Sequence, residues 1–256
     1  MEYRNLISPE FKVEIGVYVL EDGIAVEYIS SKEAHADWCR IHLTEELIGH
    51  LSIHTGDEVT VELGYEEDYD RLLVGSVGSL PKEEWKEFIV KDDFRLLETI
   101  SIKATFVKCT PQDIVKYLLT AAGIGKFELS EAAYGERDIF VADSMSASEI
   151  LKTINTFWGI SIDYYFWEGI FYWGCKPKQD YVYVLEEGNN ILNLEPYGTM
   201  WCADTIGIPW IHHSQIIEVE HTLYSGQGEV QKVVLNRDEK GFVRQSIYFL
   251  PEAAEE

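Results

Sequence analysis

Residues 56–80 read GDEVTVELGYEEDYDRLLVGSVGSL, and this stretch decides the fold class. Val59, Val61 and Leu63 alternate with polar residues, which is the period-two pattern of a strand that buries one face. The acidic residues 66–70 then indicate a turn, and RLLVGSVGSL resumes an extended pattern. The stretch therefore predicts a β-hairpin.

The same kind of pattern continues toward the N-terminus. Residues 11–20 read FKVEIGVYVL, and the EDG at residues 21–23 is a turn signal that precedes the extended IAVEYIS. Residues 38–43, WCRIHL, are a further short strand candidate. Several short strands with frequent turns are typical of a β-barrel or a β-sandwich.

Two helices are predicted in the middle of the chain. Each begins with a capping-box pattern, Thr110 with Asp113 in the first helix and Ser146 with Glu149 in the second. Apolar residues at helical spacing follow each cap, and a glycine closes each segment. In the second helix this spacing predicts that Phe157 faces inward.

An aromatic hairpin is predicted directly after the second helix. Residues 160–174 read ISIDYYFWEGIFYWG, with a turn near Glu168 and Gly169. We expect alternate aromatic side chains to form a wall of the core for the two helices. The other face could contact a partner, because Tyr and Trp anchor interfaces, or it could form a sugar-binding platform. The predicted interface residues are Tyr165, Trp167, Phe171 and Trp173.

The last part of the chain returns to strand patterns. Residues 181–185 and 191–194 are short strand candidates on either side of a Gly-Asn turn. Residues 209–213 have the character of a loop. Residues 216–223 and 229–235 then predict an antiparallel strand pair across the turn SGQG.

Charge is the most pronounced bulk property. The chain has 256 residues with 21 basic and 45 acidic side chains, which gives a formal net charge of −24. A surface this acidic repels phosphate backbones and anionic lipid headgroups. The composition therefore disfavours a nucleic-acid binder and a protein that docks on membranes. Solubility alone would also explain such a charge.

The N-terminus and the cysteines bear on the cellular compartment. The first residues lack a basic region followed by an apolar run, and no stretch of about 18 apolar residues occurs, so we expect no signal peptide and no membrane span. Cys39, Cys109, Cys175 and Cys202 are scattered without metal-ligand spacing. Free thiols in a reducing cytosol are the simplest account of them.

Four stretches, in this order, resemble the late control protein D family, the tail baseplate hubs of contractile phages and related injection machines. Residues 56–80 resemble the family's hairpin with a Gly-Asp turn and a G-x-V ending, and residues 109–124 resemble the helix that opens its inserted domain. Residues 147–173 are similar to its second helix and aromatic hairpin, and residues 216–235 to its closing strand pair. The segment IPWIHHSQIIEV departs from the family pattern, since it has Pro209 but no Pro-Gly turn.

The resemblance implies a mainly β fold with an α+β insert. Two β-barrel hub domains, residues 1–98 and 179–256, would flank a small helix-helix-hairpin domain at residues 99–178. It also implies a structural, non-enzymatic protein of the virion tail baseplate, made in the bacterial cytoplasm, with no cofactor and no metal. Three copies would form a pseudo-sixfold ring that joins the sixfold tail tube to the threefold central spike.

The partners implied by the resemblance are two further copies of the chain, the tail tube protein, the central spike protein and the tape-measure protein. DNA would pass through the lumen of the homotrimer without specific binding. The acidic charge fits this role, because a passing polyanion slides past a wall that repels it. We therefore expect many carboxylates to line the lumen of the ring.

Two groups of side chains are candidate metal ligands. His212, His213 and His221, together with Cys202, have the donor types that Zn²⁺ prefers, but their spacing fits no tight zinc motif. The acidic turn offers carboxylates to a hard cation such as Ca²⁺, although no D-x-D-x-D-G pattern occurs. We expect no metal at either place. The acidic residues of the turn are Glu66, Glu67, Asp68 and Asp70.

A cell-wall hydrolase or a carbohydrate-binding β protein is the main alternative. Glycoside hydrolysis needs two carboxylates about 5–10 Å apart in a cleft. With 45 acidic residues such proximity arises by chance, so it gives no signal. No serine-, cysteine- or zinc-hydrolase motif and no nucleotide-binding glycine motif occurs. A β protein of another assembly is a third hypothesis.

Overall fold

The computed structural model describes residues 6, 8–66, 68–80 and 86–252. The chain divides into two compact units. One, the β unit, consists of Met1–Asp92 together with Lys178–Glu256, and the other, the α+β unit, consists of Asp93–Pro177. The expected mainly β fold with a small helical part is confirmed. The division into three domains at residues 1–98, 99–178 and 179–256 stays a prediction.

The first segment of the β unit is built from antiparallel strands. The predicted hairpin of residues 56–80 is confirmed, with Val61 opposite Leu73 and Tyr65 opposite Asp68. In its first strand Val59, Val61 and Leu63 are buried, as their alternation predicts. The strands are β1 (Glu10–Ile15), β2 (Tyr18–Leu20), β3 (Ile24–Ser31), β4 (Trp38–Leu43), β5 (Glu58–Tyr65), β6 (Asp68–Ser79) and β7 (Glu87–Lys91).

The last segment of the β unit adds strands to the same sheet. β17 pairs with β3 antiparallel, from Lys232 opposite Ser31 to Arg237 opposite Val26. The path β14-β15-β18-β17-β3-β4-β7-β6-β5-β1-β2 is therefore continuous, with β16 beside β17 and β13 parallel to β16. The strands are β13 (Tyr183–Glu186), β14 (Ile191–Tyr197), β15 (Met200–Thr205), β16 (Ile216–His221), β17 (Tyr224–Arg237) and β18 (Val243–Pro251).

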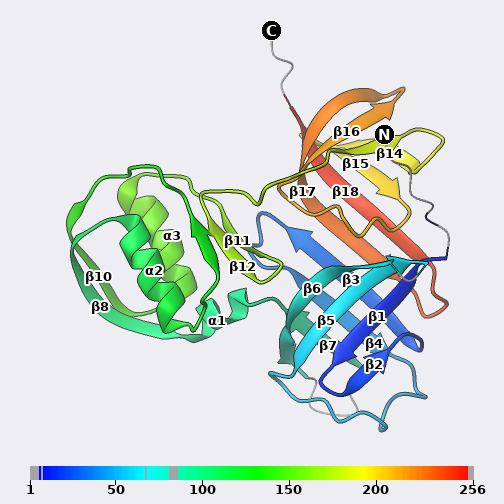
Figure 1. Ribbon diagram of the computed structural model, residues 1–256, viewed down its shortest axis with the longest axis horizontal. Coiled ribbons are helices and arrows are strands. Elements are labelled where there is room, and N and C mark those ends of the chain that lie inside the picture. The colour runs from blue at the N-terminus through cyan, green and yellow to red at the C-terminus, as the bar shows by residue number, and fades with distance from the viewer. Residues whose placement is uncertain (1–5, 7, 67, 81–85, 253–256) are drawn as a thin grey trace. The chain divides into compact units, whose positions relative to one another are not determined.

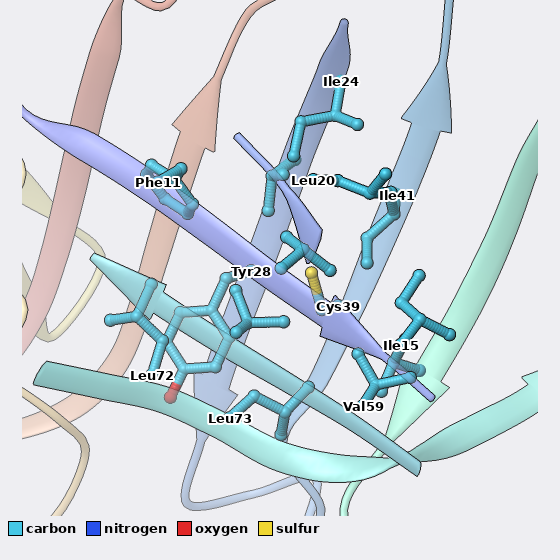
Figure 2. Packing of buried hydrophobic residues seen from close by; sticks show 14 of the residues in the cluster. Phe11, Ile15, Leu20, Ile24, Tyr28, Cys39, Ile41, Val59, Leu72 and Leu73 are labelled. Carbon is cyan, nitrogen blue, oxygen red and sulfur yellow. The ribbon is translucent and has the colours of Figure 1, made fainter. Parts of the chain in front are cut away.

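Two hydrophobic cores lie along this sheet. The first is formed by side chains of β1 to β7, and Figure 2 shows part of it, with the Tyr28 ring among aliphatic side chains. The second is formed by residues of the last segment, including Val233. Leu235, two residues further along the same face of β17, belongs to the first core, as does Val243 of β18. The long hairpin of β17 and β18 therefore contributes to both cores.

The α+β unit contains both predicted helices. In α2 and in α3 the two halves of the capping box are present. Figure 1 shows α2 and α3 side by side over the antiparallel ribbon of β8 and β10. The elements are α1 (Phe94–Thr99), β8 (Ser101–Cys109), α2 (Pro111–Ala121), β9 (Phe127–Leu129), β10 (Arg137–Ser146), α3 (Ala147–Trp158), β11 (Tyr164–Trp167) and β12 (Ile170–Trp173).

One prediction for α3 is wrong, and one for the hairpin is confirmed. Phe157 is 43% exposed, whereas Trp158 is buried, so the inward face is shifted by one residue near the end of the helix. β11 and β12 are joined at Glu168 and Gly169, which both have positive φ angles, as a tight two-residue hairpin turn requires.

Among the described residues no helix is long and apolar enough to cross a bilayer.

Candidate functional site

Residues 206–215 connect β15 to β16 and form a buried strap in the β unit. Most of these residues are buried, although the backbone is neither helix nor strand. A buried loop is stable only where its backbone polar groups find partners within the protein. The contacts of the strap therefore show which parts of the β unit it holds together.

The first half of the strap is held by side chains from two distant strands. The Tyr65 hydroxyl of β5 donates to the Gly207 carbonyl. The Gln245 side chain of β18 donates to the Ile208 carbonyl at 3.0 Å and accepts from the Ile208 N–H at 2.7 Å. A Cβ atom at Gly207 would lie 2.6 Å from a methyl carbon of Val243, so only glycine fits there. These contacts fix the strap between the two segments of the chain.

The second half of the strap ends in a buried polar cluster. The Tyr28 hydroxyl of β3 lies within hydrogen-bond distance of two groups, 3.0 Å from Asp37 Oδ2 and 3.2 Å from His212 Nδ1. His213 Nε2 lies 3.7 Å from Asp37 Oδ1. The Asp37 N–H donates to Asp92 Oδ2 at 2.9 Å. Tyr28, Asp37, His212 and His213 are each at most 9% exposed, so this cluster has little access to water.

Burial changes the protonation of the cluster. Desolvation raises the pKa of Asp37 to about 7, although hydrogen bonds from Tyr28, Ser30 and Ser31 partly oppose the shift. Desolvation lowers the pKa of His212 to about 4 and that of His213 to about 3. At neutral pH both imidazoles are therefore uncharged.

Ser214, His213 and Asp37 follow the order of a hydrolase triad. His213 Nδ1 lies 2.9 Å from Ser214 Oγ, and its Nε2 faces Asp37. All three residues are buried, so their side chains have no open access for a substrate. No sequence pattern marks Asp37 or Ser214, because only the packing of two distant segments against each other distinguishes them from other polar loop residues. The arrangement serves to hold the strap.

The candidate metal ligands do not converge. His212 and His213 belong to the polar cluster, whereas His221 Nε2 lies 3.6 Å from Glu187 and Cys202 lies on β15. Across the described residues, no group of three or more His, Cys, Asp or Glu side chains is arranged to hold a metal ion. Of the candidate calcium ligands, Glu67 lies outside the described residues. Glu66, Asp68 and Asp70 form no such group with other described residues.

The predicted interface residues of the aromatic hairpin differ in exposure. Tyr165, Phe171 and Trp173 are buried, and Trp167 is partly exposed. The Tyr165 ring stacks on that of Tyr172, with centroids 6.0 Å apart, and the Trp173 ring meets the ring of Tyr134 edge to face. The role of these four residues in binding a partner stays a prediction, and Trp167 has the most accessible side chain.

Comparison with known proteins gives no match by sequence and clear matches by structure. No protein-family model and no curated protein matches the chain. The 43 kDa tail protein of prophage MuSo2 from Shewanella oneidensis aligns with a TM-score of 0.75 and 13% identity over 95% of this chain and 98% of that chain. The tail protein from Neisseria meningitidis MC58 aligns with a TM-score of 0.72 and 12% identity over 96% and 97%.

A third neighbour belongs to a secretion machine. The E. coli c3393 protein, a component of the type VI secretion system with structural similarity to the T4 bacteriophage tail proteins gp27 and gp5, aligns with a TM-score of 0.71 and 10% identity. The alignment covers 95% of this chain and 77% of that chain. The resemblance seen in the sequence is thus confirmed as a likeness of fold, and the chain has the fold of phage tail proteins.

Proposed function

We propose that the chain is the structural baseplate hub protein of a phage or phage-like tail. The observation that carries the proposal is the alignment of nearly the whole chain with two tail proteins and with a secretion-system component related to T4 tail proteins. In this proposal residues 1–98 and 179–256 are two barrel-like hub domains, and residues 99–178 are an insert. The protein has no catalytic role and resides in the tail baseplate.

The architecture of the β unit supports this role. A ring that joins a sixfold tube to a threefold spike needs two β domains in each of three copies. The β unit has two hydrophobic cores, which are joined by the continuous pairing of β3 with β17. A continuous sheet transmits force between its parts without a flexible linker. The proposed partners are two further copies of the chain, the tail tube protein, the central spike protein and the tape-measure protein.

The charge supports passage of DNA through such a ring. With a net charge of −24, three copies carry a large excess of carboxylates, some of which would line the lumen. A polyanion would then pass without adhering to the wall. Electrostatic mapping of an experimental structure of the trimer tests this point, and a neutral or basic lumen would contradict it.

Size-exclusion chromatography with light scattering tests the assembly. The chain is examined alone and mixed with a phage tail tube protein and a central spike protein. We expect either a trimer, at three times the 29.4 kDa chain mass, or a monomer that becomes trimeric with the spike protein. A monomer that binds neither protein overturns the proposal, and a monomer that cleaves peptidoglycan indicates a cell-wall hydrolase instead.

Trp167 is the proposed contact of the aromatic hairpin with a neighbouring tail protein. The Trp167 side chain is only partly buried, so a partner can contact it and the fold does not depend on it. Trp167→Ala should therefore weaken co-assembly and leave the circular dichroism spectrum unchanged. Phe242→Ala is the matched control, since Phe242 is 63% exposed in a turn of the β unit. Equal co-assembly of the two variants would remove the hairpin from the proposed interface.

A further inference from the structure

The side chains of Asp37, Tyr28 and His212 lie in sequence, and the number of protons that they share decides which hydrogen bonds can form between them. Tyr28 Oη lies within hydrogen-bond distance of Asp37 Oδ2 and of His212 Nδ1. A tyrosine hydroxyl has one proton, so it donates to only one of these two atoms. The other contact needs a second proton, which is carried either by the Asp37 carboxyl group or by His212 Nδ1. Without it, two acceptors face each other in a buried site.

The surroundings favour the carboxyl group as the carrier of this proton. The pKa of His212 is lowered by burial to about 4, so its ring is neutral near pH 7 and has a single N–H. The ring also meets the backbone of Pro209, which lacks an N–H and can only accept a hydrogen bond from the ring. Burial raises the pKa of Asp37 to about 7, which keeps the proton on its carboxyl group in mildly acidic solution.

We propose that a proton on Asp37 locks the strap, residues 206–215, onto β3, and that its loss loosens this joint between the two cores. The protonated carboxyl group donates to Tyr28, and Tyr28 then donates to His212. When Asp37 ionises, Tyr28 turns its proton toward Asp37 and His212 loses its donor. The β unit thus contains a pH-sensitive latch that acts independently of the proposed function.

Burial, and not a neighbouring charge, favours the neutral form of Asp37. Asp92, which follows β7, accepts a hydrogen bond from the Asp37 N–H through its Oδ2. On the strap, His212 and His213 are neutral near pH 7 and offer no positive charge. Lys32, which follows β3, is paired with Glu229 of β17 at 3.3 Å, and Lys32 and His35 both disfavour a charge on His213.

The direction of the pH effect follows from linkage. Asp37 has a raised pKa in the folded chain, so its stabilisation of the closed strap is complete below its ordinary value of 3.8 and is lost as the pH rises through about 7. His212 and His213 have lowered pKa values, so their contribution is lost as the pH falls below 6.5. Between about pH 4 and 7 the effect of Asp37 on stability therefore opposes the effect of the two histidines. A variant at position 37 is needed to separate them.

Asp37→Asn separates the two effects, because its amide N–H₂ donates to Tyr28 at every pH. Hydrogen exchange of the strap amides, corrected for the intrinsic rate, is compared between wild type and variant from pH 5 to 8. One reporter is the Ser214 N–H, which donates to the Val230 carbonyl. We expect the exchange ratio of wild type to variant to rise with pH, by up to about tenfold per unit, and to level off above pH 7. Asp180→Asn, an exposed aspartate of the β unit, should give a constant ratio.

A measurement on the wild-type chain keeps the proposal falsifiable if Asp37→Asn fails to fold. The carboxyl ¹³C chemical shift of Asp37 is titrated by NMR in the folded protein. A midpoint near 7 supports the latch. A midpoint near 4 overturns it, and so does a strap exchange rate with the same pH dependence in wild type and Asp37→Asn.

Discussion

The Gln245 side chain binds the backbone of Ile208 on both of its polar groups. Its Nε2 donates to the Ile208 carbonyl, and its Oε1 accepts from the Ile208 N–H, in a site where Gln245 is 1% exposed. A primary amide is the side-chain group that satisfies an adjacent donor and acceptor in this way. Gln245 therefore pairs with the backbone N–H and carbonyl of the strap, as a neighbouring strand does within a sheet.

Gln245→Leu should destabilise the chain strongly. The substitution keeps a similar volume but leaves the buried N–H and carbonyl of Ile208 without partners, which costs about 2–4 kcal/mol. Urea unfolding should show a lower midpoint with an unchanged slope. Gln227→Leu, at an exposed position of β17, is the control and should change the free energy of unfolding by less than about 0.5 kcal/mol. Equal midpoints for the two variants would show that the strap does not depend on this contact.

Arg237→Met should weaken the tie between the β17–β18 hairpin and the turn before β3. The guanidinium, which is 6% exposed, donates to the carbonyls of Ile24 and Glu21. Methionine replaces its aliphatic stem but leaves both carbonyls without this donor, for an expected loss of about 2–4 kcal/mol. Lys240→Met, at an exposed turn position of the same hairpin, is the control. A similar thermal midpoint for both variants would contradict the prediction.

Gly75→Ala and Gly78→Ala should differ sharply, although both residues lie in β6. A Cβ atom at Gly75 would lie 2.1 Å from the Lys91 carbonyl oxygen, so β7 would have to move. At Gly78 the nearest atom would be 3.5 Å away, an ordinary contact. We expect Gly75→Ala to cost about 1–3 kcal/mol or to prevent folding, and Gly78→Ala to be nearly neutral. Soluble yield and denaturant midpoint measure the difference, and a neutral Gly75→Ala would refute the close approach of β7.

The parts of the fold that the sequence predicts are those with local signals. Both capping boxes, the aromatic hairpin and the β5–β6 hairpin depend on residues close together in the chain. β18 was missed because the buried Gln245 interrupts the alternation of Val243, Ile247 and Phe249. β10 was missed because it belongs to a two-stranded ribbon and buries only a few apolar side chains, so most of its residues are polar or exposed.

The polar cluster has no local signal in the sequence. Tyr28 and His212 are 184 positions apart, and the raised pKa of Asp37 comes from its burial in the folded chain. His212 and His213 stand out in the sequence as adjacent histidines. Adjacent histidines suggest metal ligands rather than a hydrogen bond to a tyrosine. The pairing of β3 with β17, which brings the two segments together, likewise depends on tertiary packing that no short pattern encodes.

The capping box of α3 should give the stability of the α+β unit a specific pH dependence. The Ser146 N–H donates to Glu149 Oε2 at 2.8 Å, and this bond, followed by that of the Ser146 hydroxyl, holds the pKa of Glu149 below its ordinary value of 4.5. A lowered pKa means that the stabilisation is present above the unfolded value and is lost as the pH falls through the folded value. Wild type should therefore be more stable than Glu149→Gln at pH 7, and the difference should shrink as the pH falls below 4.5. Thermal midpoints across this range test it, with the exposed Glu131→Gln as the control. A difference that persists unchanged at pH 3 would show that the ionised carboxylate is not what stabilises the start of α3.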